Sequence, residues 1–264
     1  MITNPRSRLA ASTYLNSAPL IWCFLHGFLH GSQRDALDFT DAVPARCAQL
    51  LSQNAVDAAL VPVIEYQRIP GGALVPDVCV GSQKEVLSVV LVSKNAQLEN
   101  IHTVALDESS RTSATLVKII FREFLGREAE WTTRSPDLGE MLERNDAALI
   151  IGDPGMTFPR TGLKLWDMAS LWRNYTGFGF VFAMWMVRNE SIDVDFAGAR
   201  DEGVTRIDEI VDAYKDRIPM DLRKYLTENI VYRIDESMQR GLELYFELAH
   251  KHRLIEHVKP LRYI

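Results

Sequence analysis

The sequence predicts an α/β protein built from two similar lobes. Short apolar strands alternate with amphipathic helices, which is typical of sheets flanked by helices, and this alternation restarts after Ser93. In addition, Asp57-Ala-Ala-Leu-Val-Pro62 is echoed by Asp146-Ala-Ala-Leu-Ile-Ile-Gly152. Each segment follows a short amphipathic helix and ends in polar, turn-forming residues. The echo is short, and buried strands often resemble one another, so it supports two lobes only together with the alternation.

The first half of the chain combines strands with helices that begin at recognisable signals. Ser17 and Pro19 provide a cap and a first-turn residue, and Pro44 opens a second helix. The run before Ser93 is continuous and β-branched, as in an interior strand. The predicted elements are strands at Leu9–Ala11, Val56–Pro62 and Val86–Ser93, and helices at Leu20–Phe28 and Ala45–Gln53.

The second half repeats this order and then returns to the first lobe. Its predicted elements are strands at Thr103–Leu106, Glu130–Thr132 and Ala147–Ile151, and helices at Arg111–Leu125 and Leu138–Arg144. After Asp167, a helix end, a Gly-containing loop and an apolar strand indicate a return crossover. The helical segments Phe196–Asp216, Met220–Asn229 and Asp235–Lys251 should pack around the first lobe. We expect residues 1–93 and 186–264 to form lobe I and residues 94–185 to form lobe II.

Composition favours a small-molecule ligand over a macromolecular partner. The 264 residues are 47% hydrophobic and carry a net charge of −6, with no run rich in Lys or Arg. This pattern argues against nucleic acid or an anionic membrane as partner. The three cysteines have no metal-like or CxxC spacing, which indicates buried thiols in a reducing compartment. Because polar residues interrupt the N-terminal apolar segment, we expect no signal peptide and a cytoplasmic protein.

The segment Val104–Phe121 carries the most informative pattern. An apolar strand passes through a hydroxyl-rich turn directly into an amphipathic helix. Free N–H groups of the first helical turn, the positive end of the helix dipole and the nearby hydroxyls would converge on one point, which suits a carboxylate or a phosphate. The residues of this predicted anion site are Ser109, Ser110, Arg111, Thr112 and Ser113. Two alternatives remain: a serine simply caps the helix, and Arg111 pairs with Glu108.

Other polar residues follow predicted strands, where open α/β sheets bind ligands. They are Asn16 and Ser17 after the first strand, Glu65 and Tyr66 after the Val56–Pro62 strand, and Gly152 and Asp153 after the second echo. Ser88, in the strand that approaches the crossover, would point into the same cleft. Each has a plainer interpretation: Asn16 stabilises a turn, Gly152–Gly155 is only a β-turn, and Ser88 faces solvent.

Motifs for metals, nucleotides or thiol catalysis are absent. His26 and His30 are four residues apart but lack the intervening carboxylate of an HExxH motif. There is no GxGxxG and no P-loop, and Cys47 has no paired histidine in the sequence pattern. We therefore predict no metal site, and nucleotide binding has no support in the sequence.

Several segments together resemble the chorismate dehydratase family, which carries out the first step of the futalosine route to menaquinone. The resemblance covers about residues 8–190. Its segments are Tyr14-Leu15-Asn16 with Pro19-Leu20, Val43-Pro44, Val86-Leu87-Ser88-Val89, Ser109-Ser110-Arg111-Thr112-Ser113, Ile151-Gly152-Asp153-Pro154, and Thr176-Gly177 ahead of Phe180-Val-Phe-Ala-Met-Trp185. Departures from the family pattern are Thr13 for Ser, Gly179 for Pro, and His252-Arg253 where Gly is usual.

The resemblance implies a fold like that of type II periplasmic binding proteins, with each lobe a mixed sheet flanked by helices and a ligand cleft between the lobes. It also implies a cofactor-free dehydration of chorismate to 3-[(1-carboxyvinyl)oxy]benzoate by a monomer or a homodimer. Asn16 and Ser88 would be catalytic. The residues that bind substrate would be Ser17, Ser109, Ser110, Arg111, Thr112, Ser113, Gly152 and Asp153.

The resemblance leaves the general base open. The matched segments contain no His or Lys, so the enolpyruvyl carboxylate of the substrate and Asp153 are both candidates. Two rival functions also remain: a non-catalytic cytoplasmic binding protein for a small dicarboxylate, and the related dihydroxynaphthoate synthase, whose Cys-Pro-Asn-Asp signature this chain lacks.

Overall fold

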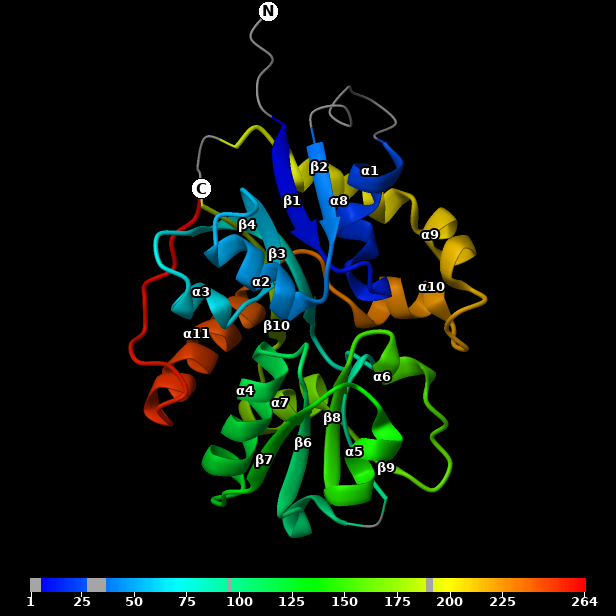
Figure 1. Ribbon diagram of the computed structural model, residues 1–264, viewed down its shortest axis with the longest axis vertical. Helices are drawn as coiled ribbons and strands as arrows, with labels where there is room; N and C mark the ends of the chain where they lie inside the picture. The colour runs from blue at the N-terminus through cyan, green and yellow to red at the C-terminus, as the bar shows by residue number, and fades with distance from the viewer. Residues whose placement is uncertain (1–5, 28–36, 95, 189–191) are drawn as a thin grey trace, which may run out of the picture.

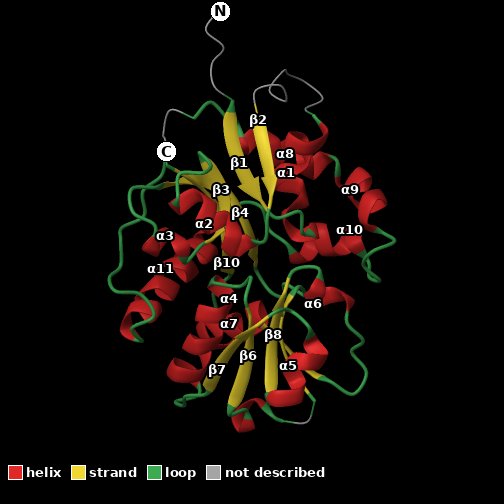
Figure 2. Ribbon diagram, viewed as in Figure 1, coloured by secondary structure: helices red, strands yellow, loops and turns green. Residues whose placement is uncertain are grey.

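The computed structural model describes residues 6–27, 37–94, 96–188 and 192–264. It contains two five-stranded mixed sheets, one above the other in Figure 1, and each is flanked by helices (Figure 2). The two-lobed α/β architecture predicted from the alternating pattern is therefore confirmed.

The first lobe is built on the sheet with strand order β2-β1-β3-β10-β4. Strand β1 runs parallel to β2 and β3, whereas β10 is antiparallel to β3 and β4. The strands are β1 (Ser7–Ala11), β2 (Leu37–Asp41), β3 (Ala58–Pro62), β4 (Ala73–Ser82) and β10 (Phe180–Val187). The helices are α1 (Ala18–His26), α2 (Pro44–Ser52), α3 (Glu65–Arg68), α8 (Phe196–Thr205), α9 (Ile207–Tyr214), α10 (Leu222–Lys224) and α11 (Glu236–Lys251).

The second lobe repeats this plan with the order β7-β6-β8-β5-β9. Strand β6 is parallel to β7 and β8, and β5 is antiparallel to β8 and β9. Its strands are β5 (Val89–Ser93), β6 (Thr103–Asp107), β7 (Glu130–Arg134), β8 (Ala147–Ile151) and β9 (Lys164–Asp167). Its helices are α4 (Thr112–Ile119), α5 (Leu138–Arg144), α6 (Pro154–Thr157) and α7 (Met168–Thr176).

The internal echo in the sequence corresponds to equivalent strands. Strands β3 and β8 carry the two echoed segments, and each occupies the third position of its sheet. In both sheets the fourth strand, β10 or β5, arrives from the other lobe. The echo is therefore a structural repeat, and all five residues of each strand are buried.

The crossovers lie earlier in the chain than we expected. Strand β5 pairs with β8 and β9, so Val89–Ser93 belongs to the second sheet, and β10 brings Phe180–Trp185 into the first. The chain thus changes lobe at residues 83–88 and 177–179, rather than after residues 93 and 185. A uniformly apolar strand carries no mark of the sheet that it joins, which explains the shift of one strand at each boundary.

The C-terminal helices contact more than the first lobe. As expected, α8 packs on α1 and β4, but α11 contacts both β10 and α4 of the second lobe. The Tyr245 hydroxyl on α11 donates a hydrogen bond of 2.9 Å to the Thr112 carbonyl at the start of α4. Helix α11 therefore joins the two lobes along the side seen at the left of Figure 1.

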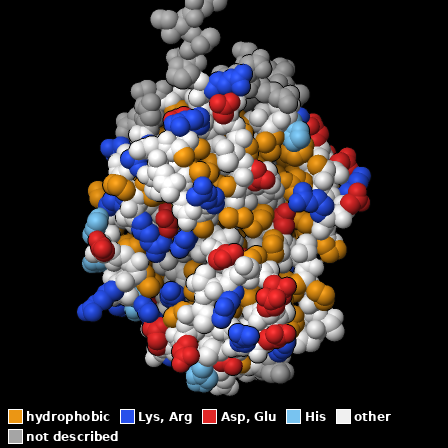
Figure 3. All heavy atoms as spheres, viewed as in Figure 1, with side chains coloured by type: hydrophobic (Ala, Val, Ile, Leu, Met, Phe, Trp, Pro, Cys, Tyr) orange, Lys and Arg blue, Asp and Glu red, His pale blue; other side chains and the backbone are white. Residues whose placement is uncertain are grey.

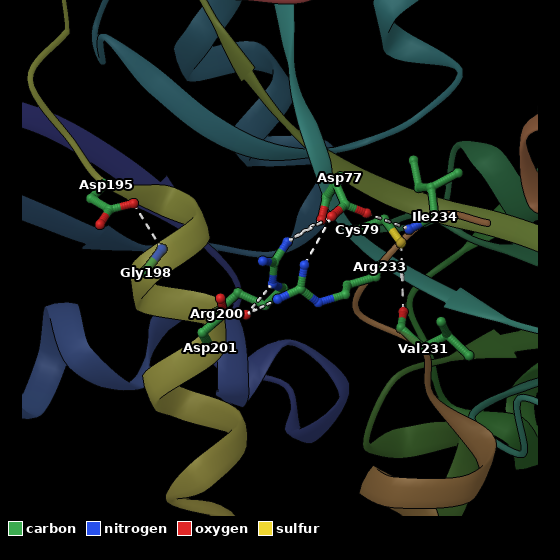
Figure 4. Close-up of polar contacts among 9 residues, drawn as sticks. All are labelled: Asp77, Cys79, Asp195, Gly198, Arg200, Asp201, Val231, Arg233 and Ile234. Carbon is green, nitrogen blue, oxygen red and sulfur yellow. Dashed lines mark hydrogen bonds and ion pairs between the residues drawn. The ribbon is translucent and has the colours of Figure 1, made fainter.

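A buried arginine holds α8 against β4 (Figure 4). The side chain of Arg200 is 3% exposed; its Nε lies 2.8 Å from the Asp201 carboxylate, and Nη1 donates to the Asp77 carbonyl. Arg233, which is 57% exposed, reaches the carboxylates of the same two aspartates. The cluster thus fixes α8 and the segment after α10 to the middle of β4.

Cysteine placement and surface charge fit a globular α/β protein. Cys23, Cys47 and Cys79 are buried and form no disulfide, and burial raises the pKa of the Cys47 thiol to about 12. Acidic and basic side chains are intermingled on the face seen in Figure 3. None of the described helices combines the length and apolar character needed to cross a bilayer.

Candidate functional site

A cavity lies between the two lobes, and together with its mouth open to solvent it encloses about 560 Å³. The first lobe contributes the segment after β1, the start of α2 and inward faces of β3, β4 and β10, whereas the second contributes the β6–α4 turn and the end of β8. Its walls are formed by Ser12, Tyr14, Asn16, Ser17, Pro44, Leu60, Pro62, Val80, Val89, Ser109, Ser110, Arg111, Thr112, Ser113, Ile151, Gly152, Phe182 and Ala183. The structure therefore brings most of the predicted site residues to one cavity.

The first turn of α4 has no side-chain cap. Arg111 occupies the N-cap position with φ −120° and accepts no capping hydrogen bond, and the Ser109 hydroxyl donates instead to Asp107 at 2.6 Å. The Ser110 Oγ is buried in the cavity wall and has no hydrogen-bond partner in the described part of the chain. A buried hydroxyl without a partner is unusual, so this one points to a ligand or a water. The alternative that a serine caps the helix is wrong.

The remaining hydroxyls and the cation of this turn also face the cavity. Thr112 Oγ1 accepts a hydrogen bond of 3.3 Å from the Ile64 amide of the first lobe, which leaves its proton free for a ligand. Ser113 is buried beside it, and Arg111 is exposed. Glu108 accepts a hydrogen bond from Ser135 at 3.1 Å, and no ion pair joins it to Arg111 among the described residues.

Asp107 is a buried structural carboxylate under this turn, not a surface charge as its neighbours in the sequence suggest. It is 1% exposed and accepts hydrogen bonds from the Ser109 amide at 2.9 Å, the Ser109 hydroxyl, and the Ile151 amide at 3.3 Å. Burial raises its pKa, and the bonds to Ser109 oppose that rise. Asp107 thereby ties the anion-site turn to the end of β8.

On the first-lobe wall, the side chain of Asn16 is available to bind a ligand, whereas that of Ser17 is not. Both residues lie in a 3-10 turn at Leu15–Ser17 that leads into α1. The Ser17 hydroxyl donates inward to the Ser12 carbonyl at 2.7 Å, so its proton is already engaged. The Asn16 amide forms no hydrogen bond with another described residue and lines the cavity. Of this predicted pair, Asn16 is the better placed to meet a ligand.

Gly152 and Asp153 have different positions relative to the cavity. Gly152 lines it with φ +67°, and a Cβ atom there would lie 2.4 Å from the ring of Tyr14. The Gly155 amide donates to the Gly152 carbonyl at 2.9 Å, so the expected β-turn also exists. The Asp153 carboxylate is outside the wall and accepts a hydrogen bond of 2.8 Å from the Leu15 amide of the first lobe. Burial raises the pKa of Asp153.

Ser88 is buried and is not part of the cavity wall. It is 0% exposed, does not line the cavity, and its hydroxyl has no partner among the described residues. Its neighbour Leu87 has φ +58°, a conformation rare for a residue with a side chain. The Asp167 carboxylate stabilises this turn by accepting a hydrogen bond of 2.7 Å from the Leu87 amide. The expectation that Ser88 points into the cleft, or toward solvent, is therefore wrong.

Sequence reasoning missed two polar residues of the wall and, besides Ser88 and Asp153, included two more that lie elsewhere. Ser12 and Tyr14 line the cavity beside Asn16. Their position directly after β1, within the segment matched to the family, was the available signal. Glu65 pairs with Arg68 at 2.6 Å, and the Tyr66 hydroxyl donates to the Pro260 carbonyl at 2.6 Å, so neither reaches the cavity.

The described residues contain no group of three or more His, Cys, Asp or Glu side chains arranged to hold a metal ion. Of the two histidines considered above, His26 is the last residue of α1, and His30 lies outside the described residues.

Comparison with known proteins assigns the chain to a family. Residues 7–251 match the family model described as menaquinone biosynthesis. The chain belongs to the menaquinone biosynthesis family. Among the curated proteins of this kind, it is 31% identical over 265 residues to a chorismate dehydratase from Thermus thermophilus, an alignment that covers 90% of this chain and 93% of the relative.

Solved structures confirm the fold expected of the family. A protein from Archaeoglobus fulgidus superposes with a TM-score of 0.73 at 15% identity, covering 95% of this chain and 98% of that one. The periplasmic aliphatic sulphonate binding protein of Escherichia coli gives 0.64 at 13% identity, with 99% and 94% covered. At these identities the similarity establishes the fold alone, and that fold is the one of periplasmic binding proteins.

Proposed function

We propose that this protein is a chorismate dehydratase of menaquinone biosynthesis, a hydro-lyase. The observation that carries the proposal is the uncapped start of α4, where the unpartnered Ser110 hydroxyl faces a cavity enclosed by both lobes. Membership of the family and the similarity to a chorismate dehydratase indicate that chorismate is the substrate bound at this anion site.

The substrate's carboxylates match the polar parts of the cavity. Chorismate carries two carboxylates, and the hydroxyls of Ser110, Thr112 and Ser113, with the free amides of α4, would bind one of them. Arg111 adds a positive charge at the same wall. The aliphatic and aromatic residues of the first lobe, among them Leu60 and Phe182, would cover the ring.

The reaction removes the ring C3 proton and the C4 hydroxyl, and the product ring becomes aromatic. Aromatisation supplies the driving force, so the chemistry that we propose requires no metal or organic cofactor. The ring carboxylate acidifies the C3 proton through conjugation, and negative charge develops on that carboxylate as the proton leaves. Donors fixed around it would stabilise this charge, which is how such sites lower a barrier.

Two candidates for the proton acceptor differ in their position. Asp153 lies outside the cavity wall, and its Oδ1 is engaged by the Leu15 amide. We therefore favour the enolpyruvyl carboxylate of the substrate as the base and assign Asp153 to holding the lobes together. Asn16, which has no protein partner, would orient the reacting ring or the departing hydroxyl. Ser88 would support the crossover rather than contact the substrate.

We also infer a cytoplasmic protein, in keeping with the three unbridged cysteines. Its partner would be a small molecule rather than nucleic acid or a membrane, and the protein would act as a monomer or a homodimer.

Incubation of the purified protein with chorismate tests the function directly. The expected result is loss of chorismate and formation of the aromatic product, followed by absorbance and identified by mass spectrometry. Tight binding of chorismate without turnover would favour a dicarboxylate-binding protein, whose fold this chain shares. Turnover only of the substrate of dihydroxynaphthoate synthase would favour that neighbouring step.

Substitution of Asn16 tests the site. Asn16→Ala should lower kcat by about 100-fold, because a positioned polar group contributes about this much or more to such reactions. The thermal midpoint should stay unchanged, since the Asn16 amide has no described hydrogen-bond partner. Full activity in Asn16→Ala would contradict its proposed role.

A further inference from the structure

Among the described residues, only two side chains of the cavity wall carry a titratable proton. They are Tyr14 and Arg111. A guanidinium stays protonated at any pH that the protein tolerates, so it cannot give up a proton and regain it. A phenol can. Departure of the C4 hydroxyl requires a proton if that group is to leave as water, and Tyr14 is the wall residue able to provide it.

Tyr14 is held between the two lobes. It follows β1 of the first lobe, and its ring packs against Gly152 of the second, where a Cβ atom would come within 2.4 Å of the ring. The Ser17 amide donates to the Tyr14 carbonyl at 3.0 Å, and the Tyr14 amide donates to the Ser12 hydroxyl at 3.3 Å. These contacts fix the backbone and the ring of Tyr14 at the junction of the lobes.

The phenol of Tyr14 interacts with the Ser109 hydroxyl and with the charge of the buried Asp107. Both groups act on its ionisation: burial and the Asp107 charge raise the pKa of Tyr14, and the Ser109 hydroxyl opposes this rise. The Ser109 proton is committed to Asp107 at 2.6 Å. Because burial and the Asp107 charge both disfavour the phenolate, Tyr14 stays a neutral phenol with a proton to donate.

We propose that Tyr14 is the proton donor to the departing hydroxyl, and that Ser109 and Asp107 position it for this step. The inference rests on the proposed function. The C3–H bond breaks and its electron pair forms the new ring double bond, while the C4–O bond breaks and its electron pair leaves with oxygen. That oxygen takes the phenol proton and departs as water. The proton removed from C3 then returns to the phenolate through the base that accepted it, so protons and charge balance.

Tyr14→Phe tests the step with little structural change, because the ring that packs on Gly152 remains. We expect kcat to fall by about 100-fold or more, the usual contribution of a positioned acid, while the dissociation constant of chorismate changes by less than about threefold. The matched control is Tyr214→Phe. Tyr214 lies near the same segment and donates to the Thr13 carbonyl at 2.6 Å but does not line the cavity, so its kcat should change by less than about threefold.

A second measurement separates proton donation from packing. Incorporation of 3,5-difluorotyrosine at Tyr14 lowers the pKa of the phenol without changing its position in the chain. The alkaline limb of the kcat profile should move to lower pH, because the donor loses its proton earlier. The same replacement at Tyr214 should leave the limb in place.

The outcomes separate this inference from the proposed function. If the wild-type protein converts chorismate and Tyr14→Phe is as fast, or weakens only binding, the inference is wrong and the function stands. An alkaline limb that fails to move with difluorotyrosine also overturns the inference. If the wild-type protein binds chorismate without converting it, the proposed function fails and the inference falls with it.

Discussion

The Asp153 carboxylate accepts a hydrogen bond of 2.8 Å from the Leu15 amide, and this bond joins the second lobe to the first across the cavity. Two further bonds cross the same boundary: the Ala45 amide donates to the Ser109 carbonyl at 3.2 Å, and the Ile64 amide donates to Thr112 Oγ1 at 3.3 Å. All three end at, or directly beside, residues of the cavity wall. The contacts that join the lobes therefore lie at the edge of the binding site.

Removal of the Asp153 carboxylate should weaken ligand binding more than folding. Asp153→Ala removes a bond between the lobes, and a charge-assisted bond of this kind contributes about 1.5–3 kcal/mol. Because the variant favours separated lobes, we expect the dissociation constant of chorismate to rise about tenfold, measured by calorimetry, with little change in the free energy of unfolding.

The matched control for Asp153 is Asp137→Ala. Asp137 accepts a hydrogen bond of 3.0 Å from the Glu140 amide at the start of α5, within one lobe. Its loss should lower stability by about 1 kcal/mol and leave affinity unchanged. Equal affinities for the Asp153 variant and the wild type would show that the bond does not contribute to closure.

Gly152→Ala should prevent the lobes from meeting correctly. A Cβ atom there would lie 2.4 Å from the Tyr14 ring, far inside van der Waals contact, and the residue has φ +67°. We expect a loss of at least about tenfold in kcat/KM for chorismate. Gly162→Ala is the control, because Gly162 has φ +75° and nothing within 4 Å of its Cβ position. The activity of Gly162→Ala therefore shows the effect of backbone strain without a steric clash. If both variants lose activity equally, contact with Tyr14 is not the cause.

Ser110 and Ser109 should respond in opposite ways to loss of the hydroxyl. Ser110→Ala removes a buried group that has no protein partner, so stability should be unchanged or slightly higher, whereas chorismate affinity should fall about 5–20-fold. Ser109→Ala removes a donor to the buried Asp107 and should lower the free energy of unfolding by about 1–3 kcal/mol. Chemical denaturation and calorimetry on both variants measure the two effects. A marked loss of stability in Ser110→Ala would contradict the site as described.

The sequence predicted the repeated core well because local patterns encode it. Helix α5 and strand β8 lie where periodicity placed them, and the echo between β3 and β8 reflects equivalent positions in the two sheets. Strand β2 was missed because it is mostly exposed and has no apolar run. Strand β4 was missed because Pro76 and Asp77 interrupt its apolar pattern, and Asp77 has φ +55°.

The sequence predicted only part of the site, and the residues that it missed or misplaced share one physical cause. Hydroxyls near a helix start are visible in a sequence, so the turn around Ser110 was found. The burial of Asp107 depends on Ile151, and the role of Asp153 depends on Leu15, which is 138 residues away. Such contacts between distant segments leave no local pattern, and Ser88 was misplaced for the same reason.

Arg200 provides a test of the first lobe that is independent of the cavity. Its side chain is 3% exposed and is the donor to the Asp77 carbonyl and to the Asp201 carboxylate (Figure 4). Arg200→Ala would leave these acceptors without their buried donor and open a void between α8 and β4. Because Asp77 and Asp201 are 47% and 53% exposed, the cost comes mainly from the void and the lost hydrogen bonds, and we expect the free energy of unfolding to fall by about 2–4 kcal/mol.

The control for Arg200 is Arg233→Ala, which removes a cation from the same two aspartates at the surface. The Arg233 side chain is 57% exposed, and an exposed ion pair contributes at most about 1 kcal/mol. Urea denaturation of both variants measures the difference, which should shrink little in 1 M salt because most of it comes from the packing of the buried Arg200 side chain rather than from its charge. If the two variants are equally stable, burial of Arg200 is not what attaches α8 to the sheet.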